Sequence, residues 1–108
     1  MTRSENMSPE RWEILNLAVA TYGPEAQLKM MIEEMSELTK AICKLWRTRP
    51  GSPEVFEAEQ NILEEAADVQ IMLDQIRIIF GDTEEIEGKK VARLLSRLDD
   101  HDGKEAQT

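Results

Sequence analysis

The sequence is poor in the side chains that build redox and zinc sites, because its 108 residues include one cysteine, Cys43, and one histidine, His101. A single cysteine forms no internal disulfide, which favours a reducing compartment and predicts a cytoplasmic protein. Without a histidine partner, Cys43 is expected to be a small buried residue. The lone histidine lies in a polar C-terminal segment, which argues against a di-iron bundle built on Glu-x-x-His motifs.

Basic residues are also scarce, with 13 Lys and Arg against 22 Asp and Glu, and the net charge is -9. A nucleic-acid backbone is therefore not an expected partner, because neutralising phosphates requires clustered cations. An anionic substrate would need accompanying metal ions or a local basic patch. No uncharged apolar stretch approaches the roughly 18 residues of a membrane span, and the N-terminal MTRSENMSPE lacks the apolar core of a signal peptide.

What the sequence does contain is a series of helix signals and no strand-like alternation. Ser8-Pro9-Glu10 and Ser52-Pro53-Glu54 each combine a capping hydroxyl, a proline in the first turn and an acid near the positive helix end. Gly23 ends one helix before Pro24 starts the next. The pattern predicts an all-α protein.

The expected helices cover about residues 9–22, 24 to 46 or 47, 53–80, and 82 or 83 to 98. The third helix either runs uninterrupted or has a kink or short turn between residues 57 and 61. Residues 1–7 are expected to be a flexible N-terminus, residues 8–98 one helical domain, and residues 99–108 a polar, disordered tail. A loop of this length between the second and third helices predicts an antiparallel pair within a four-helix bundle-like protomer.

Two carboxylates interrupt the apolar face of the third predicted helix. Over residues 62–80, ILEEAADVQIMLDQIRIIF, the apolar side chains repeat at helical spacing, and Glu65 and Asp68 fall inside the arc that they form. An unpaired ionised carboxylate on a packed face is destabilising, so something positive should lie against this pair. A salt bridge to a lysine or arginine would be the structural alternative.

A second pair of acids lies on the preceding helix. Glu34 is at the edge of an apolar stripe and Glu37 is one turn further along on the same side, although both could also belong to a solvated flank. Antiparallel packing would bring Glu34 and Glu37 against Glu65 and Asp68. Because four carboxylates repel one another unless cations lie between them, and because the cluster offers only oxygen ligands, we expect Mg²⁺, with Mn²⁺ as a substitute.

The spacing of these acids resembles that of a known family. Glu34-x-x-Glu37 and, after 27 intervening residues, Glu65-x-x-Asp68 are similar to the paired-acid signature of the MazG-like all-α nucleoside triphosphate pyrophosphohydrolases. The resemblance spans roughly residues 12–98 and is closest to small single-domain bacterial and phage members. Its other motifs are Tyr22-Gly23-Pro24-Glu25 leading to Gln27, IEEMSELTKAICK at 32–44, LEEAADVQIML at 63–73, IIFGD at 78–82, and Lys90-x-x-Arg93-Leu94 with Arg97.

The resemblance implies hydrolysis of a nucleoside triphosphate between its α and β phosphates, giving a monophosphate and pyrophosphate. By position, Glu34, Glu37, Glu65 and Asp68 would hold Mg²⁺. Glu33 or Glu64 would take the proton of the attacking water, and we favour Glu33. The residues expected to bind substrate are Lys90 and Arg93 on the phosphates, with Gln27 and Arg97 as weaker candidates. Lys90, Arg93 and Arg97 could instead only complement the negative end of their helix.

The third helix also suggests self-association. Ile71 and Ile78 fall on nearly the opposite side from its inner arc, and a helix that is apolar on most sides is buried on most sides. We therefore expect a shared-core homodimer with C2 symmetry, and a tetramer is also compatible with the pattern. The alternative to an enzyme is a non-catalytic helical dimer that binds a nucleotide or a protein partner.

Overall fold

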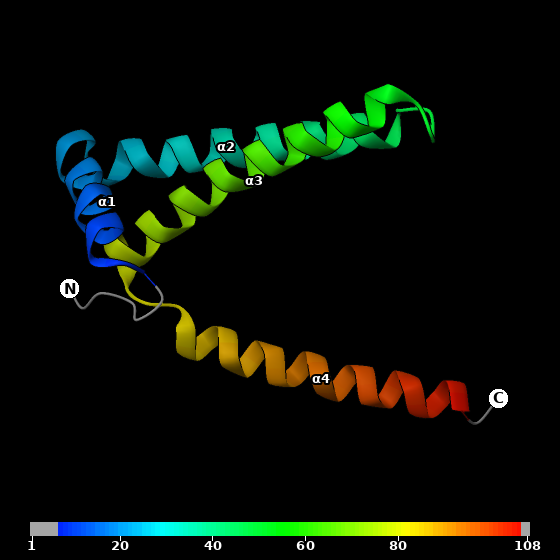
Figure 1. The fold of residues 1–108 in the computed structure, drawn as a ribbon. Helices are drawn as coiled ribbons and strands as arrows, with labels where there is room; N and C mark the ends of the chain where they lie inside the picture. The colour runs from blue at the N-terminus through cyan, green and yellow to red at the C-terminus, as the bar shows by residue number, and fades with distance from the viewer. Residues whose placement is uncertain (1–6, 107–108) are drawn as a thin grey trace.

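A computed structural model describes residues 7–106, and within that range the protein is entirely helical. Its four helices are α1 (Pro9–Tyr22), α2 (Pro24–Trp46), α3 (Pro53–Phe80) and α4 (Glu84–Ala106). The first three agree with the predicted ranges, and α3 is continuous through residues 57–61 (Figure 1). The all-α prediction is confirmed.

The helix boundaries follow from local capping chemistry. The Ser8 hydroxyl accepts a hydrogen bond from the backbone N–H of Arg11 at 3.2 Å, which satisfies one of the free donors of the first turn of α1. Gly23 has φ +90° and Gly81 has φ +131°, so each turns the chain through a conformation that other residues rarely adopt. These two glycines separate α1 from α2 and α3 from α4.

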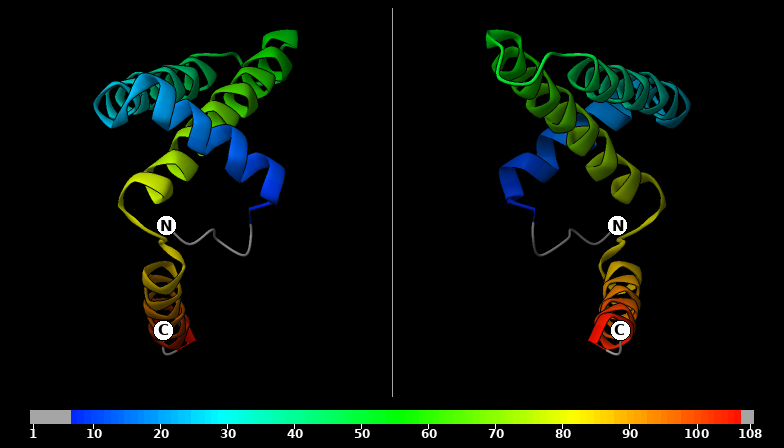
Figure 2. Two further views of the ribbon diagram at one scale, coloured as in Figure 1. Left: turned by 90° about the vertical axis from the view of Figure 1, so that its left-hand side faces the viewer. Right: turned by 90° about the vertical axis from the view of Figure 1, so that its right-hand side faces the viewer.

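α2 and α3 form an antiparallel hairpin, and α1 packs across the end at which α2 begins and α3 ends (Figures 1 and 2). Ala41 of α2 and Ala58 of α3 are almost completely buried, which fits a close approach of the two helices. A second core lies under α1, where Met7 and Leu15 pack with Ile78, and Trp12 and Val19 cover them in part. Among the described residues, no large side chain is fully buried.

α4 leaves the rest of the chain at Gly81 and runs as a separate arm (Figures 1 and 2). Within the described residues it packs along none of the other three helices, so the single chain is a three-helix body with an arm rather than the predicted four-helix bundle. The radius of gyration is 18.2 Å. A compact domain of this length would have about 13 Å.

Some burial differs from the predictions because α1 covers a different side of α3. Ile78, predicted to face a second subunit, is 5% exposed and packs against α1, whereas Phe80, assigned to the inner arc, is 70% exposed. Met7 belongs to the core under α1 and not to a flexible N-terminus. Cys43, predicted to be buried, is exposed.

The C-terminal end of α4 also differs from its predicted boundary. The helix continues past residue 98 to Ala106, into the segment predicted to be a disordered tail. Once a helix is nucleated, each further residue adds a hydrogen bond at little cost, and residues 99–106 contain no proline to stop it. The remaining predicted flexible positions, 1–6 and 107–108, lie outside the described residues. In the described part of the chain, no helix has the length and apolar character needed to cross a membrane.

Candidate metal centre

Three of the four predicted acidic ligands converge between α2 and α3. One carboxylate oxygen from each of Glu34, Glu65 and Asp68 lies within 4.8 Å of the other two. Glu34 and Glu65 are half-buried in the seam, whereas Asp68 is exposed at its edge. The cluster forms because the antiparallel hairpin places the middle of α2 against the middle of α3.

The electrostatics of the cluster show the repulsion that the sequence predicted. The pKa of Glu34 is raised above its usual value, first by desolvation and then by the charges of Asp68 and Glu65. Glu37 and Glu33 add smaller contributions in the same direction. In the absence of a cation, the ionised form of Glu34 is therefore disfavoured.

Within residues 7–106, no cationic side chain is paired with these carboxylates. Among the described residues, no lysine or arginine forms an ion pair with Glu34, Glu65 or Asp68. Glu65 and Asp68 thus do not form, with any described residue, the salt bridge that was the structural alternative to a metal site. The three carboxylates face one another and solvent.

The donor set and its spacing fit a hard divalent cation. Carboxylate oxygens bound to Mg²⁺ lie about 2.1 Å from the ion, and those bound to Ca²⁺ about 2.4 Å, so ligands around one ion are about 3–5 Å apart. The separation of up to 4.8 Å is compatible with that range after small rotamer changes. Three acids leave room for waters or substrate oxygens, as Mg²⁺ usually requires.

The two remaining acids of α2 lie beside the cluster and not in it. Glu37 is about half exposed, and one of its carboxylate oxygens lies 3.6 Å from Nζ of Lys40, one turn along the same helix. An exposed ion pair of this kind is weak, so Glu37 can leave Lys40 at little cost. Glu33 is exposed and adds to the negative potential at Glu34. Glu64, the other candidate base, is exposed next to Glu65.

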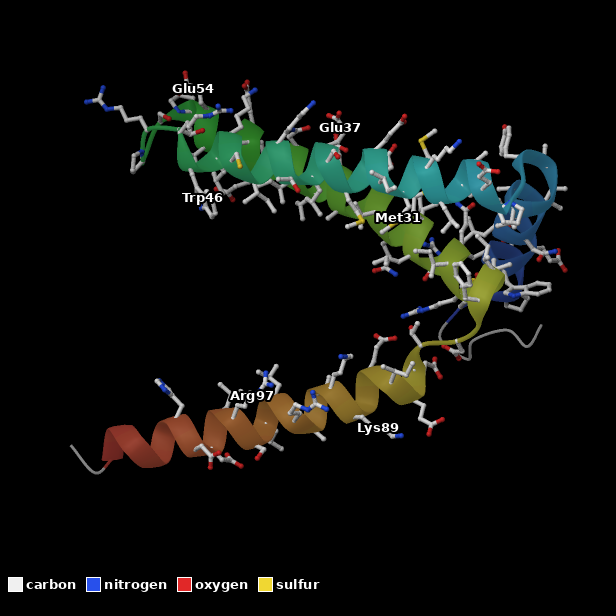
Figure 3. All side chains as sticks on the ribbon, turned by 180° about the vertical axis from the view of Figure 1, so that it is seen from behind. Met31, Glu37, Trp46, Glu54, Lys89 and Arg97 are labelled. Carbon is white, nitrogen blue, oxygen red and sulfur yellow. The ribbon has the colours of Figure 1, made fainter. Side chains whose placement is uncertain are left out.

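The predicted phosphate ligands are not at the cluster within one chain. Lys90, Arg93 and Arg97 all lie on α4, which does not pack on α2 or α3 in the described residues. Figure 3 shows Arg97 on the arm, well apart from Glu37 on α2. The sequence places these three basic residues on the fourth predicted helix, but it carries no information on which surface that helix packs against.

Gln27, a weaker substrate candidate, is engaged in the seam. Its Nε2 donates a hydrogen bond to Oε1 of Gln75 at 2.7 Å, and Nε2 of Gln75 lies 3.5 Å from Sδ of Met72. Gln75 is almost completely buried, and the sequence reasoning did not identify it. It follows Asp68 by seven residues, two helical turns, so it was a third polar residue on the packed face of α3.

A buried acid, Asp74, was also missed. The residue is 5% exposed, and its carboxylate accepts hydrogen bonds from Arg11 of α1, from Arg77 at 3.2 Å and from Gln70 at 3.1 Å. Arg77 in turn donates to Thr83 and Glu87, both at 2.8 Å. Unlike the acidic cluster, Asp74 is thus fully compensated by the protein, which identifies it as a structural residue that joins three helices.

Comparisons of the chain with models of protein families, with curated proteins and with solved structures found no match. The uncompensated carboxylates between α2 and α3 are therefore the feature from which a function can be argued.

Proposed function

We propose that this protein is a Mg²⁺-dependent nucleotide pyrophosphohydrolase that cleaves nucleoside triphosphates between the α and β phosphates. The observation that carries the proposal is the convergence of Glu34, Glu65 and Asp68 within 4.8 Å, with no lysine or arginine of the described residues paired with any of them. The resemblance of the two acid pairs to the MazG-like signature supports the choice of reaction. The reaction consumes one water and releases a nucleoside monophosphate and pyrophosphate.

The three converging carboxylates would hold the metal, and Glu37 could join them by releasing Lys40. When bound, Mg²⁺ would neutralise charge that develops on the phosphates and lower the pKa of a nearby water. Mn²⁺ should substitute for it, because it accepts the same oxygen ligands.

The proton of the attacking water would pass to a neighbouring carboxylate. Glu33 is the residue we assign, since it is exposed, borders Glu34 and is not needed as a ligand. Gln27, which is held by Gln75 at the end of the seam, and Arg97 are weaker candidates for contacting the nucleotide.

The active unit in this proposal is a homodimer, or a dimer of dimers, in the cytoplasm. Several large apolar side chains on α1, α2 and α3 are more than half exposed, including Leu17, Trp46 and Phe56. A second copy of the chain would cover such surfaces, and Lys90 and Arg93 would then bind substrate phosphates in the assembled dimer.

The test is to incubate the protein with Mg²⁺ and a panel of canonical and modified nucleoside triphosphates, measuring pyrophosphate and inorganic phosphate separately. We expect pyrophosphate and monophosphate in equal amounts. Glu65→Gln should lower kcat/KM by about 100-fold or more, because it removes a metal ligand. Glu59→Gln, an exposed glutamate of the same helix outside the cluster, is the matched control and should have little effect.

Failure to cleave any nucleotide, or full activity of Glu65→Gln, would contradict the catalytic proposal. In that case the exposed apolar surfaces would favour a non-catalytic helical dimer that binds a nucleotide or a protein partner. Calorimetric titration with a non-hydrolysable triphosphate would then separate these two kinds of ligand.

A further inference from the structure

α4 carries an apolar row that no other helix of the described chain covers. Val91, Leu94, Leu95 and Leu98 repeat at spacings of three and four, so they lie on one side of the helix. Each of them is at least 50% exposed. Isolated helices are only marginally stable in water, and most helices are stabilised by packing of their apolar face. A 23-residue arm with this row therefore needs a partner surface.

Hydrogen bonds and an ion pair at the start of α4 fix the direction of the arm. Nη2 of Arg77 on α3 lies 2.8 Å from Glu87 on α4, and Nε of Arg77 lies 2.8 Å from the hydroxyl of Thr83. Buried Asp74 holds Arg77 from the other side at 3.2 Å. The Asp82 carboxylate also accepts the N–H of Glu84 at 3.1 Å, which caps the first turn. The arm thus leaves the body at a defined angle.

A matching uncovered surface exists on α2. Ile32, Met35 and Trp46 fall on one side of that helix and are 65%, 48% and 78% exposed. Figure 3 shows Trp46 projecting from the side of the hairpin on which α4 lies, and Glu37 projecting from the opposite side. α2 and α4 each have 23 residues, or about 35 Å of helix, so one can lie along the whole of the other.

A further apolar surface lies at the corner between the body and the arm. A cavity of about 360 Å³ lies there, with Leu73 and Ile76 of α3 on one wall and Ile86 of α4 on the other. The polar rim of the cavity includes Arg77 and Lys90. An apolar side chain from another molecule could enter between the two walls.

The chain exposes more surface than a compact monomer, and the excess is similar to the area that a homodimer interface buries. The chain has 8408 Å² of accessible surface. A compact monomer of this mass would have about 6,100 Å². Covering the excess of roughly 2,300 Å² on each of two chains would bury about 4,600 Å², within the range of obligate homodimers.

We propose that α4 docks, through Val91, Leu94, Leu95 and Leu98, on the row formed by Ile32, Met35 and Trp46 of a second copy, and that the two copies exchange arms in this way. An anionic membrane is a less suitable partner, because the chain has a net charge of -9 and the first turn of α4 carries three glutamates. Lys90 and Arg97, which flank one side of the apolar row, would instead lie beside the acidic hairpin of the partner.

This inference rests on the proposed homodimer and not on the chemistry of the acidic cluster. It also explains why the basic residues of α4 lie far from the acids of the same chain. In the dimer, the arm would pack on the hairpin of the partner. Measurements of mass and cross-linking test it without any nucleotide, so its failure is distinguishable from a failure of the proposed hydrolysis.

The first experiment measures the mass of the full chain by light scattering. We expect about 25 kDa, or a multiple of it, against 12.4 kDa for one chain. Leu94→Asp with Leu98→Asp should give 12.4 kDa. Ala92→Asp with Ser96→Asp is the matched control, with the same charge and spacing on another face of α4, and should keep the wild-type mass. Ile32→Asp with Met35→Asp should also give monomers.

The second experiment does not depend on how the charged variants fold. In a Cys43→Ser background, chains with Leu95→Cys are mixed with chains with Ile32→Cys and treated with a short bismaleimide. We expect linked pairs that contain one chain of each kind, and many fewer when Ala92→Cys replaces Leu95→Cys. A monomeric wild type, links between α4 helices alone, a dimer insensitive to Ile32→Asp with Met35→Asp, or binding of monomers to anionic vesicles would overturn the proposal.

Discussion

Arg11 on α1 binds Asp74 on α3 through two nitrogens, with Nε and Nη2 each 2.8 Å from Oδ2. Asp74 is 5% exposed, and the second oxygen of its carboxylate accepts a hydrogen bond from Arg77. This contact joins the N-terminal helix to the helix that bears two of the acidic cluster residues. Through Arg77 it also reaches Thr83 and Glu87 at the start of the arm.

Asp74→Asn should therefore destabilise the protein by about 2–4 kcal/mol, because it leaves two arginines without their shared partner. The partial exposure of Arg11 places the value toward the lower end of that range. Denaturant unfolding at one fixed protein concentration gives the free energy. Glu10→Gln, an exposed acid next to Arg11, is the control and should change stability by less than about 0.5 kcal/mol. Equal effects of the two variants would show that Asp74 is not a structural centre.

The acidic cluster predicts a specific response to charge removal. Glu34 is surrounded by Asp68, Glu65, Glu37 and Glu33, all of which raise its pKa. Glu34→Gln should stabilise the metal-free protein by up to about 1 kcal/mol, the size of a close like-charge interaction near water. The same variant should lose the stabilisation that Mg²⁺ gives to the wild type. Thermal unfolding with EDTA and with Mg²⁺ measures both effects.

Two results would contradict this interpretation. A metal-free Glu34→Gln protein less stable than wild type would show that the carboxylate has a structural partner. A wild type that Mg²⁺ and Mn²⁺ do not stabilise would contradict the assignment of the cluster as a metal site, since a ligand of the folded state raises its stability. Glu59→Gln should respond to Mg²⁺ like the wild type.

The helices and the acidic cluster could be predicted from the sequence because both depend on local spacing. Proline and glycine mark the ends of α1, α2 and α3, and the antiparallel hairpin then brings Glu34 to Glu65 and Asp68. The direction of α4 could not be predicted, since it depends on φ +131° at Gly81 and on the hydrogen bonds that Arg77 donates across the corner to Thr83 and Glu87. Asp74 was missed because an acid on the outer side of α3 looks solvated until α1 is placed over it.

The raised pKa of Glu34 predicts how metal binding depends on pH. The pKa of Glu34 is higher in the folded state than in the unfolded state. Without metal, the contribution of Glu34 to stability is therefore fully present at pH values below the unfolded-state pKa. It is lost as the pH rises through the folded-state pKa. Metal binding has the opposite dependence, because it needs the ionised carboxylate. The stabilisation by Mg²⁺ should therefore be large near about pH 7 and decline toward about pH 5.

Thermal unfolding with and without Mg²⁺ across this range measures the effect. Glu34→Gln supplies the reference, since it should show no comparable pH-dependent gain from Mg²⁺. A Mg²⁺ effect in the wild type that stays constant down to the usual pKa of a glutamate would show that Glu34 does not titrate with the bound ion.

Gly81 between α3 and α4 and Gly88 within α4 should respond in opposite directions to alanine. Gly81 has φ +131°, and an added Cβ would meet no atom within 4 Å, so the penalty of Gly81→Ala is backbone strain alone, about 1–3 kcal/mol. Gly88 lies inside α4, also with open space around an added Cβ, and Gly88→Ala should stabilise the helix by about 0.5–1 kcal/mol. Denaturant unfolding of the two variants compares them directly.

Because Gly81 sets the angle at which the arm leaves α3, Gly81→Ala should also weaken the dimer measured by light scattering, whereas Gly88→Ala should not. A Gly81→Ala protein with wild-type stability and mass would show that the corner can form without a left-handed residue.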